Sequence, residues 1–334
     1  MADLSHQRLQ SYLHTLKGAE IAVIGDVMLD RYYWGTVSRV SPEAPVPVVD
    51  VDRETAHLGG AANVATNLLG LGASPLLIGA IGRDTNGILI KDLCSQAGLS
   101  AEYLVHVDDR PTTTKTRVIG NGQQIARVDH ESKSYIEADP TAQILERIAS
   151  RERLRGIILE DYDKGLLSPS MIRAITEHAI SRDIPVFVDP KRRHFLDFRH
   201  CTVFKPNRKE VSDALGVSLR TLEDVQKVGA ELLERLACES VLITLGAEGM
   251  MLMQRDTQPQ RIPTRARKVS DVSGAGDTTI ATLAAMVCSG ASVAEAATLA
   301  NVAAGYVVGE PGIVAITSEI LSAAVSALSD EAES

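Results

Sequence analysis

The nonapeptide DVSGAGDTT, residues 271–279, places three small residues directly before an acidic one. Gly274, Ala275 and Gly276 offer backbone N–H groups that no large side chain covers, and an Ala-rich helical segment follows. N–H groups at the start of a helix bind phosphate well. Asp277 would repel that phosphate, so we expect it to face an acceptor hydroxyl instead. The alternative is a glycine-rich connection in which Asp277 only caps the helix.

The segment KPNRKE suggests a metal site beside phosphate groups. Asn207 and Glu210 are three residues apart, so they can share one face of a helix and hold a hydrated Mg²⁺. The competing interpretation is ordinary turn chemistry after Pro206, which is the more common reason for such a pattern.

The segment TLGAEG is a candidate nucleotide loop. Thr244, Gly246 and Gly249 leave a strand in a turn that is open enough for a nucleotide, although many hairpins have similar turns. The sequence contains no GxxxxGK[ST] motif, and Asp-Thr-Thr after Gly276 breaks the GxGxxG pattern. These two standard nucleotide fingerprints are therefore excluded.

Near the N-terminus, GDVMLD and GGAAN suggest a polyol site. Asp26 and Asp30 can accept hydrogen bonds from adjacent hydroxyls, while Gly59, Gly60 and Asn63 complete the ring of contacts. Charged hydrogen bonds of this kind are worth about 1.5–3 kcal/mol each. The alternative is that Asp26 ends a strand and Asn63 caps a helix.

The formal net charge of −9 argues against a general nucleic-acid-binding surface. Anionic small molecules must then meet local basic pockets. The segment DPKRRH gathers Lys191, Arg192 and a further arginine after a strand, which suits a phosphate or carboxylate pocket. A solvated charged face is the alternative.

The four cysteines lie far apart and form no CxxC pair, which favours reduced thiols in a cytoplasmic protein. The first residues lack the pattern of a signal peptide. The longest uncharged run, 279–294, is shorter than a membrane-spanning helix. We therefore expect no membrane role.

Apolar strands alternate with helical segments along most of the chain, which predicts a three-layer, doubly wound α/β fold with a mainly parallel sheet. Ligands are expected beyond the carboxyl ends of its strands. Strand candidates are 21–27, 156–161, 185–190, 202–207 and 241–246. Helix candidates are 61–72, 85–98, 140–153, 168–182, 221–237, 276–289 and 292–309.

Two regions depart from this alternation. Residues 36–58 are rich in proline and valine, and residues 108–131 contain two β-type runs joined by Asn121-Gly122, a strong hairpin signal. Because a lone hairpin is only marginally stable, these segments should pair into a small β-sheet lid. The whole chain, 1–334, is then one domain with a lid.

Together these motifs resemble the ribokinase-like family of carbohydrate kinases. GGAANVA (59–65) is similar to the family's N-terminal signature, 271–277 to its C-terminal one, KPNRKE to its metal-and-phosphate motif and TLGAEG to its nucleotide loop. The resemblance spans about residues 18–325. It implies ATP along TLGAEG, with the adenine near Asn301, and Mg²⁺ near Asn207 and Glu210. For some members of the family it also implies a K⁺ site, which we expect near Asp271 and the 309–312 turn.

Longer stretches, including GDVMLDRYYWGTVSRVSPEAPVPVV, RVDHE, EDYDKG and DPKRRHF, resemble the branch of the family that acts on heptose 7-phosphate. This implies ATP-dependent phosphorylation of the C1 hydroxyl of D-glycero-β-D-manno-heptose 7-phosphate, a step toward the lipopolysaccharide core heptose. Many relatives carry a fused nucleotidyltransferase domain; here only the kinase step is expected. Lys191, Arg192 and Arg127 of the lid are assigned to the C7 phosphate.

The resemblance is not complete. Ser273 stands where threonine is usual, and Glu160 and Asp163 replace smaller neutral residues. The added charge argues against a contact between Lys164 and the sugar phosphate.

In the kinase interpretation, Asp277 accepts the proton of the incoming hydroxyl. Its place at a helix N-terminus predicts a low pKa. We also expect a homodimer through the lid sheets. Alternatives are a family kinase acting on another (phospho)sugar or nucleoside, a non-catalytic sensor of the same fold, and a Rossmann dehydrogenase. Asp277 together with Asn207 and Glu210 argues against the sensor, and the missing GxGxxG against the dehydrogenase.

Overall fold

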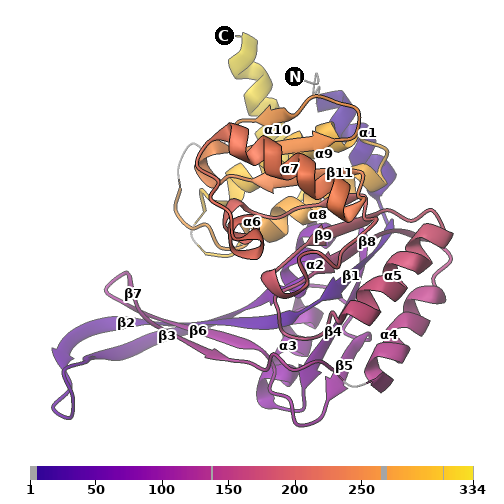
Figure 1. The fold of residues 1–334 in the computed structure, drawn as a ribbon. Helices are drawn as coiled ribbons and strands as arrows, with labels where there is room; N and C mark the ends of the chain where they lie inside the picture. The colour runs from indigo at the N-terminus through magenta and orange to yellow at the C-terminus, as the bar shows by residue number, and fades with distance from the viewer. Residues whose placement is uncertain (1–5, 137, 265–268, 311, 334) are drawn as a thin grey trace.

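The computed structural model describes residues 6–136, 138–264, 269–310 and 312–333. Within them, a nine-stranded sheet has the order β13-β12-β11-β10-β9-β8-β1-β4-β5 (Figure 1). Its strands are β1 (Glu20–Gly25), β4 (Ser74–Gly82), β5 (Leu104–Val107), β8 (Leu154–Glu160), β9 (Val186–Asp189), β10 (Val203–Phe204), β11 (Ser240–Thr244), β12 (Met250–Gln254) and β13 (Gln260–Ile262). Among these strands, β12 runs antiparallel to both of its neighbours, β11 and β13, and the other neighbouring strands pair in parallel.

Helices cover both faces of this sheet, which confirms the predicted layer arrangement. One face packs against α1 (His6–Leu16), α2 (Ala61–Gly70), α3 (Thr85–Gln96), α8 (Ala275–Cys288), α9 (Val293–Val307) and α10 (Ser318–Glu333). The other packs against α4 (Ala138–Ala149), α5 (Pro169–Ser181), α6 (Arg208–Leu215) and α7 (Leu222–Leu236). Along each strand, successive buried side chains point alternately into the apolar cores on the two faces of the sheet, as the period of two in a strand requires.

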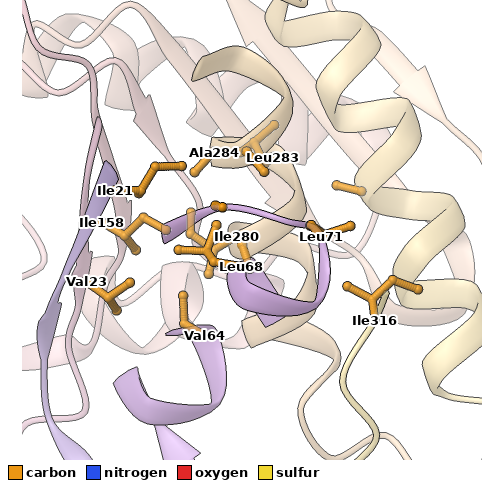
Figure 2. Packing of buried hydrophobic residues seen from close by; sticks show 14 of the residues in the cluster. Ile21, Val23, Val64, Leu68, Leu71, Ile158, Ile280, Leu283, Ala284 and Ile316 are labelled. Atoms are coloured by element: carbon orange, nitrogen blue, oxygen red, sulfur yellow. The ribbon is translucent and has the colours of Figure 1, made fainter. Parts of the chain in front are cut away.

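The helices next to the site are fixed by apolar packing on the sheet. Figure 2 shows Val64 and Leu68 of α2 beside Ile280 of α8, with Val23 of β1 and Ile158 of β8 facing them. All five side chains are fully buried. The N-termini of α2 and α8 are thereby held next to each other and above the central strands.

A second sheet, in the order β3-β2-β6-β7, extends from the body as an arm (Figure 1). Its strands are β2 (Val27–Val40), β3 (Pro47–Gly60), β6 (Thr114–Gly120) and β7 (Gln123–His130). Asn121 and Gly122 both have positive φ, 53° and 77°, and turn β6 into β7 as predicted. The first lid segment begins at Val27, earlier than residue 36, because β2 follows β1 with only Asp26 between them.

The direction of chain progression across the large sheet reverses at β1. From β1 the chain adds β4 and β5 on one side, then returns to place β8 and β9 on the other. Such a reversal opens a crevice at the carboxyl ends of the strands, where ligands bind in open α/β sheets. The loops after β1, β8 and β9 and the starts of α2 and α8 meet there.

Among the described residues, no helix combines the length and apolar character needed to cross a membrane.

Candidate active site

The start of α8 is built for close backbone approach. Gly274, its N-cap residue, has φ 80°, a left-handed conformation that favours glycine. A Cβ added there would lie 3.0 Å from Nδ2 of Asn63. The Ala275 N–H donates to the Val272 carbonyl oxygen at 3.4 Å, and no large side chain at 274–276 stands at the positive end of this 14-residue helix. This arrangement suits an anionic group.

Asp277, in the first turn of α8, is held by hydrogen bonds at both oxygens. Asn63 Nδ2 donates to Oδ2 at 2.7 Å, and the Tyr162 hydroxyl donates to Oδ1 at 2.9 Å. The side chain is buried, with the residue only 5% exposed. Asn63, predicted to contact sugar hydroxyls, thus orients Asp277 in this structure. The carboxylate has one fixed orientation and lies next to the glycine amides.

Burial raises the pKa of Asp277 to about 6; the hydrogen bonds from Asn63 and Tyr162 lower it, and the charge of Asp189 raises it. The low pKa expected from the helix N-terminus is therefore wrong, because desolvation of the carboxylate outweighs the helix dipole. A carboxylate with this pKa is still largely ionised at pH 7 and is a stronger base than an ordinary aspartate.

We predict that kcat depends on one group with an apparent pKa near 6, because Asp277 must be ionised to accept a proton. Activity should fall about tenfold per pH unit well below that value and level off above it. Initial rates between pH 4.5 and 8.5 measure this limb. A flat profile down to pH 5 would remove Asp277 from the rate-determining step.

Tyr162, which the sequence motifs did not single out, belongs to the same site. Its loop is anchored by Asp26: Oδ2 of Asp26 accepts from the backbone N–H of Tyr162 at 2.9 Å and of Lys164 at 3.0 Å. Asp26 is 4% exposed. Its position in this structure is a loop anchor, whereas the sequence suggested a sugar contact. The EDYDKG segment contributes to the sequence resemblance and carries unusual charges, but neither feature indicates a role for Tyr162.

A Tyr162→Phe variant tests the hydroxyl directly. Loss of its hydrogen bond should raise the pKa of Asp277 and free one oxygen, so the acidic limb of kcat should move to higher pH. We expect kcat at pH 7 to fall about tenfold, the effect of one hydrogen bond to a charged group. The pH profile and the KM for ATP are the measurements. A lower kcat with an unmoved pH limb would contradict the positioning role.

Asp30, Gly59 and Gly60 lie where the small sheet meets the body. A Cβ at Gly59 would come within 2.2 Å of Oδ2 of Asp30, and one at Gly60 within 2.3 Å of the Asp26 carbonyl oxygen. The two glycines therefore allow the close approach of β3 to β2. The Asp30 carboxylate forms a buried salt bridge with Arg117 of β6.

A row of buried charges lies under the start of α8. Glu160 of β8 is in register with Asp189 of β9, and Lys205 follows β10 alongside. Lys205 Nζ lies 2.6 Å from Oδ2 of Asp189. The Glu160 carboxylate is fully buried, and among the described atoms neither of its oxygens has a hydrogen-bond partner. Burial and the charges of Asp189 and Asp277 raise its pKa well above the usual value.

Asn207 and Glu210 form the capping box of α6. Asn207 Oδ1 accepts from the Glu210 N–H at 2.8 Å, and Glu210 Oε2 accepts from the Asn207 N–H at 2.7 Å. The other oxygen of Glu210 holds the Lys191 ammonium, which also lies 3.7 Å from Asp189. Turn chemistry is therefore present, and it places a carboxylate and a lysine at the edge of the crevice.

A cavity of about 320 Å³ opens on the other side of the α8 start. It is lined by Thr244, Gly246, Gly249, Ala275, Gly276 and Asn301, together with Thr264, Thr279 and small or apolar residues between 247 and 308. The structure thus brings together the four residues predicted for the nucleotide and two of the three residues whose amides were predicted for the phosphate, Ala275 and Gly276. Asn301 donates its amide to the Pro263 carbonyl oxygen at 2.7 Å. The cavity is mostly apolar, as an adenosine site requires.

Two of the three cations predicted for a sugar phosphate have carboxylate partners in this structure, and the third is exposed. Lys191 is bound by Glu210, Arg127 of β7 is exposed and pairs with Asp129 on its own strand, and Arg192 is exposed. Among the described residues, no group of three or more histidine, cysteine or carboxylate side chains is arranged to hold a metal directly.

Comparison with known proteins assigns the chain to a family. The sequence profile of the pfkB family carbohydrate kinases matches residues 19–320. "Bifunctional protein HldE" of Geobacter sulfurreducens is 43% identical over 87% of the chain, and that of Caulobacter vibrioides is 43% identical over 94%. The chain spans 59% and 65% of the length of these two relatives.

Solved structures share the fold. Arabidopsis thaliana ribokinase complexed with ribose and ATP has a TM-score of 0.75 and 20% identity, over 92% of this chain and 99% of that one. Escherichia coli phosphofructokinase-2 in complex with substrates and products has a TM-score of 0.77 and 18% identity, over 93% and 99%. The chain therefore belongs to the pfkB family of carbohydrate kinases and is an ATP-dependent sugar kinase.

Proposed function

We propose that this kinase transfers the γ-phosphoryl group of ATP to the C1 hydroxyl of D-glycero-β-D-manno-heptose 7-phosphate and so forms the 1,7-bisphosphate. The observation that carries the proposal is the position of Asp277: it follows 274–276 in the first turn of α8, and Ala275 and Gly276 line the nucleotide cavity. A base, an anion site and a nucleotide site thus meet at the start of one helix. The resemblance of the longer sequence stretches supports the heptose.

In this proposal, the attacking O1 of the sugar forms a bond to the γ-phosphorus as the bond from that phosphorus to the β,γ-bridging oxygen breaks, and ADP leaves. The O1 proton passes to Asp277. The amides of 274–276 stabilise charge on the equatorial phosphoryl oxygens. Lys205 and Lys191 add positive charge beside them. Asn63 and Tyr162 keep the base aimed at O1, and lid closure excludes water.

The residues near Asn207 fit a hydrated Mg²⁺. All candidate donors there are oxygens, as Mg²⁺ prefers. Both Glu210 oxygens and the Asn207 side-chain oxygen already have partners, so contact through water suits the site better than direct coordination. Bound there, the ion would neutralise charge on the β- and γ-phosphates. Asn207 and Glu210 would orient its water ligands.

A K⁺ site remains part of the proposal at the loop after residue 269. The N–H groups of Ser270 and Asp271 donate to the Val308 carbonyl at 2.7 and 3.2 Å, so this loop lies beside the end of α9. Residue 311 of the expected 309–312 turn lies outside the described residues. E. coli phosphofructokinase-2 has been solved in complex with potassium.

An ADP-release assay across matched pairs of sugars tests the reaction. The panel contains heptose 7-phosphate, the free heptose, and other phosphorylated and free hexoses and pentoses, each with Mg-ATP. We expect the highest kcat/KM with heptose 7-phosphate and a new anomeric phosphate signal by ³¹P NMR. Preference for another sugar would support the alternative of a different sugar or nucleoside kinase. The 1,7-bisphosphate would lead to the lipopolysaccharide core heptose.

We further propose a homodimer through the lid. The arm exposes apolar side chains on its two edge strands, with Val51 of β3 53% and Val128 of β7 58% accessible, and burial of such side chains favours association. Light scattering at micromolar concentration should give twice the 35.8 kDa chain mass. A Val51→Lys, Val128→Lys double variant should shift the protein toward monomer. A wild-type monomer at that concentration would overturn the proposal.

A further inference from the structure

Lys115 of β6 is a half-buried cation that lies outside the salt bridges of the small sheet. Its Nζ lies 3.0 Å from Sδ of Met28 and 5.3 Å from the centre of the Tyr162 ring. Among the described residues, no carboxylate forms a salt bridge with it. Burial, and then the nearby Lys164 ammonium, lower its pKa. An anion bound at this ammonium would relieve both penalties.

The carboxylates beside Lys115 are already engaged. In the small sheet Lys115 is in register with Asp30 of β2 and Asp129 of β7. Asp30 is paired with Arg117, and Asp129 accepts two 3.0 Å hydrogen bonds from Arg127. These carboxylates and that of Glu131 act on Lys115 only from beyond salt-bridge distance. Among these charges of the small sheet, the Lys115 ammonium group is therefore left without a salt-bridge partner.

The position of Lys115 matches the acceptor side of the site. The Tyr162 ring lies under its ammonium group, and the hydroxyl of that ring contacts Asp277. One aromatic ring thus separates the cation from the base, a span comparable with that of a sugar ring. The nucleotide cavity is lined entirely by residues after 243 and includes no residue of the small sheet. An anion at Lys115 therefore comes from the acceptor rather than from ATP.

We propose that Lys115 binds the phosphate group of the acceptor sugar and thereby selects phosphorylated over unphosphorylated acceptors. The inference rests on the proposed kinase reaction and names the residue that gives it specificity. It differs from the expectation for Lys191, Arg192 and Arg127, since the first and last of these have carboxylate partners and Arg192 is exposed. A lysine from the lid also couples lid closure to the presence of the phosphate.

A Lys115→Met variant tests this with heptose 7-phosphate and the matched free heptose. Loss of a charged contact should lower kcat/KM for the phosphorylated sugar about 10- to 100-fold. For the free sugar the change should stay below about threefold, and the KM for ATP should not change. Lys227→Met, on the exposed face of α7, is the control and should behave as wild type. Calorimetric titration of heptose 7-phosphate without ATP reads binding independently of turnover.

The outcomes separate this inference from the proposed function. If Lys115→Met lowers kcat/KM equally for both sugars, or for neither, the role of Lys115 is overturned while the proposed kinase reaction stands. A raised KM for ATP with equal losses would assign Lys115 to the nucleotide phosphates and also overturn it. The wild-type enzyme could instead prefer another sugar, while Lys115→Met lowers kcat/KM only for the phosphorylated form of that sugar. That result would overturn heptose 7-phosphate as the substrate and would support the role of Lys115. Unchanged binding in the titration would contradict it independently of rates.

Discussion

Replacing Asp277 with asparagine is expected to lower kcat at least about 100-fold, because general-base catalysis contributes about 10²–10⁴-fold. Asparagine keeps the shape of the side chain and its place beside Asn63 and Tyr162 but cannot accept the proton from O1. The KM for ATP should change little, since the nucleotide cavity contains the backbone of Ala275 and Gly276 and not this side chain. Steady-state rates with saturating ATP measure the loss.

Stability distinguishes this catalytic effect from a folding defect. The pKa of Asp277 is raised from 3.8 to about 6 on folding, so its contribution favours the fold below pH 4 and is lost as pH rises through 6. A shift of this size corresponds to roughly 3 kcal/mol. Asp277→Asn should therefore unfold at an equal or higher temperature than wild type at pH 8. A lower melting temperature together with lost activity would indicate structural damage, and near-normal turnover would refute the base.

The local structure that short motifs encode was predictable from sequence. The small residues before Asp277 are consecutive in the chain, so the helix start that they indicate is a local feature. In the structure, α8 begins there. The hairpin at Asn121-Gly122 is equally local, because both residues tolerate positive φ. The parallel sheet follows from continuous apolar strands between helices. In each case the information lies within a few neighbouring residues.

What sequence reasoning missed depends on neighbours across the sheet. Asp189 and Lys205 meet because β9 and β10 are adjacent, and nothing in either segment alone reveals the pair. Tyr162 reaches Asp277 only because Asp26, far away in sequence, holds its loop. The pKa of Asp277 was misjudged for the same reason: the burial that raises it is created by distant segments.

The second large effect is expected from Lys205→Met, which should destabilise the fold by about 3–5 kcal/mol, because removal of one partner leaves a buried charge unpaired. Lys205 is 2% exposed and lies 2.6 Å from Asp189, which is 4% exposed. Once it is gone, the nearest cation to Asp189 is Lys191 at 3.7 Å, and Lys191 is shared with Glu210. Urea unfolding at pH 7.5 measures the loss.

Two further variants decide whether charge is the cause. Adding Asp189→Asn to Lys205→Met removes the stranded carboxylate and should recover most of the lost stability, while activity stays low because the cation beside the phosphoryl site is still missing. Lys209→Met removes an exposed lysine from an i,i+4 pair on α6 and should unfold like wild type. If the double variant is no more stable than Lys205→Met, lost packing of the lysine stem, and not an unpaired charge, explains the destabilisation. In that case, packing rather than charge pairing stabilises the buried charged residues under α8. The positive charge that assists phosphoryl transfer would then come from Lys191.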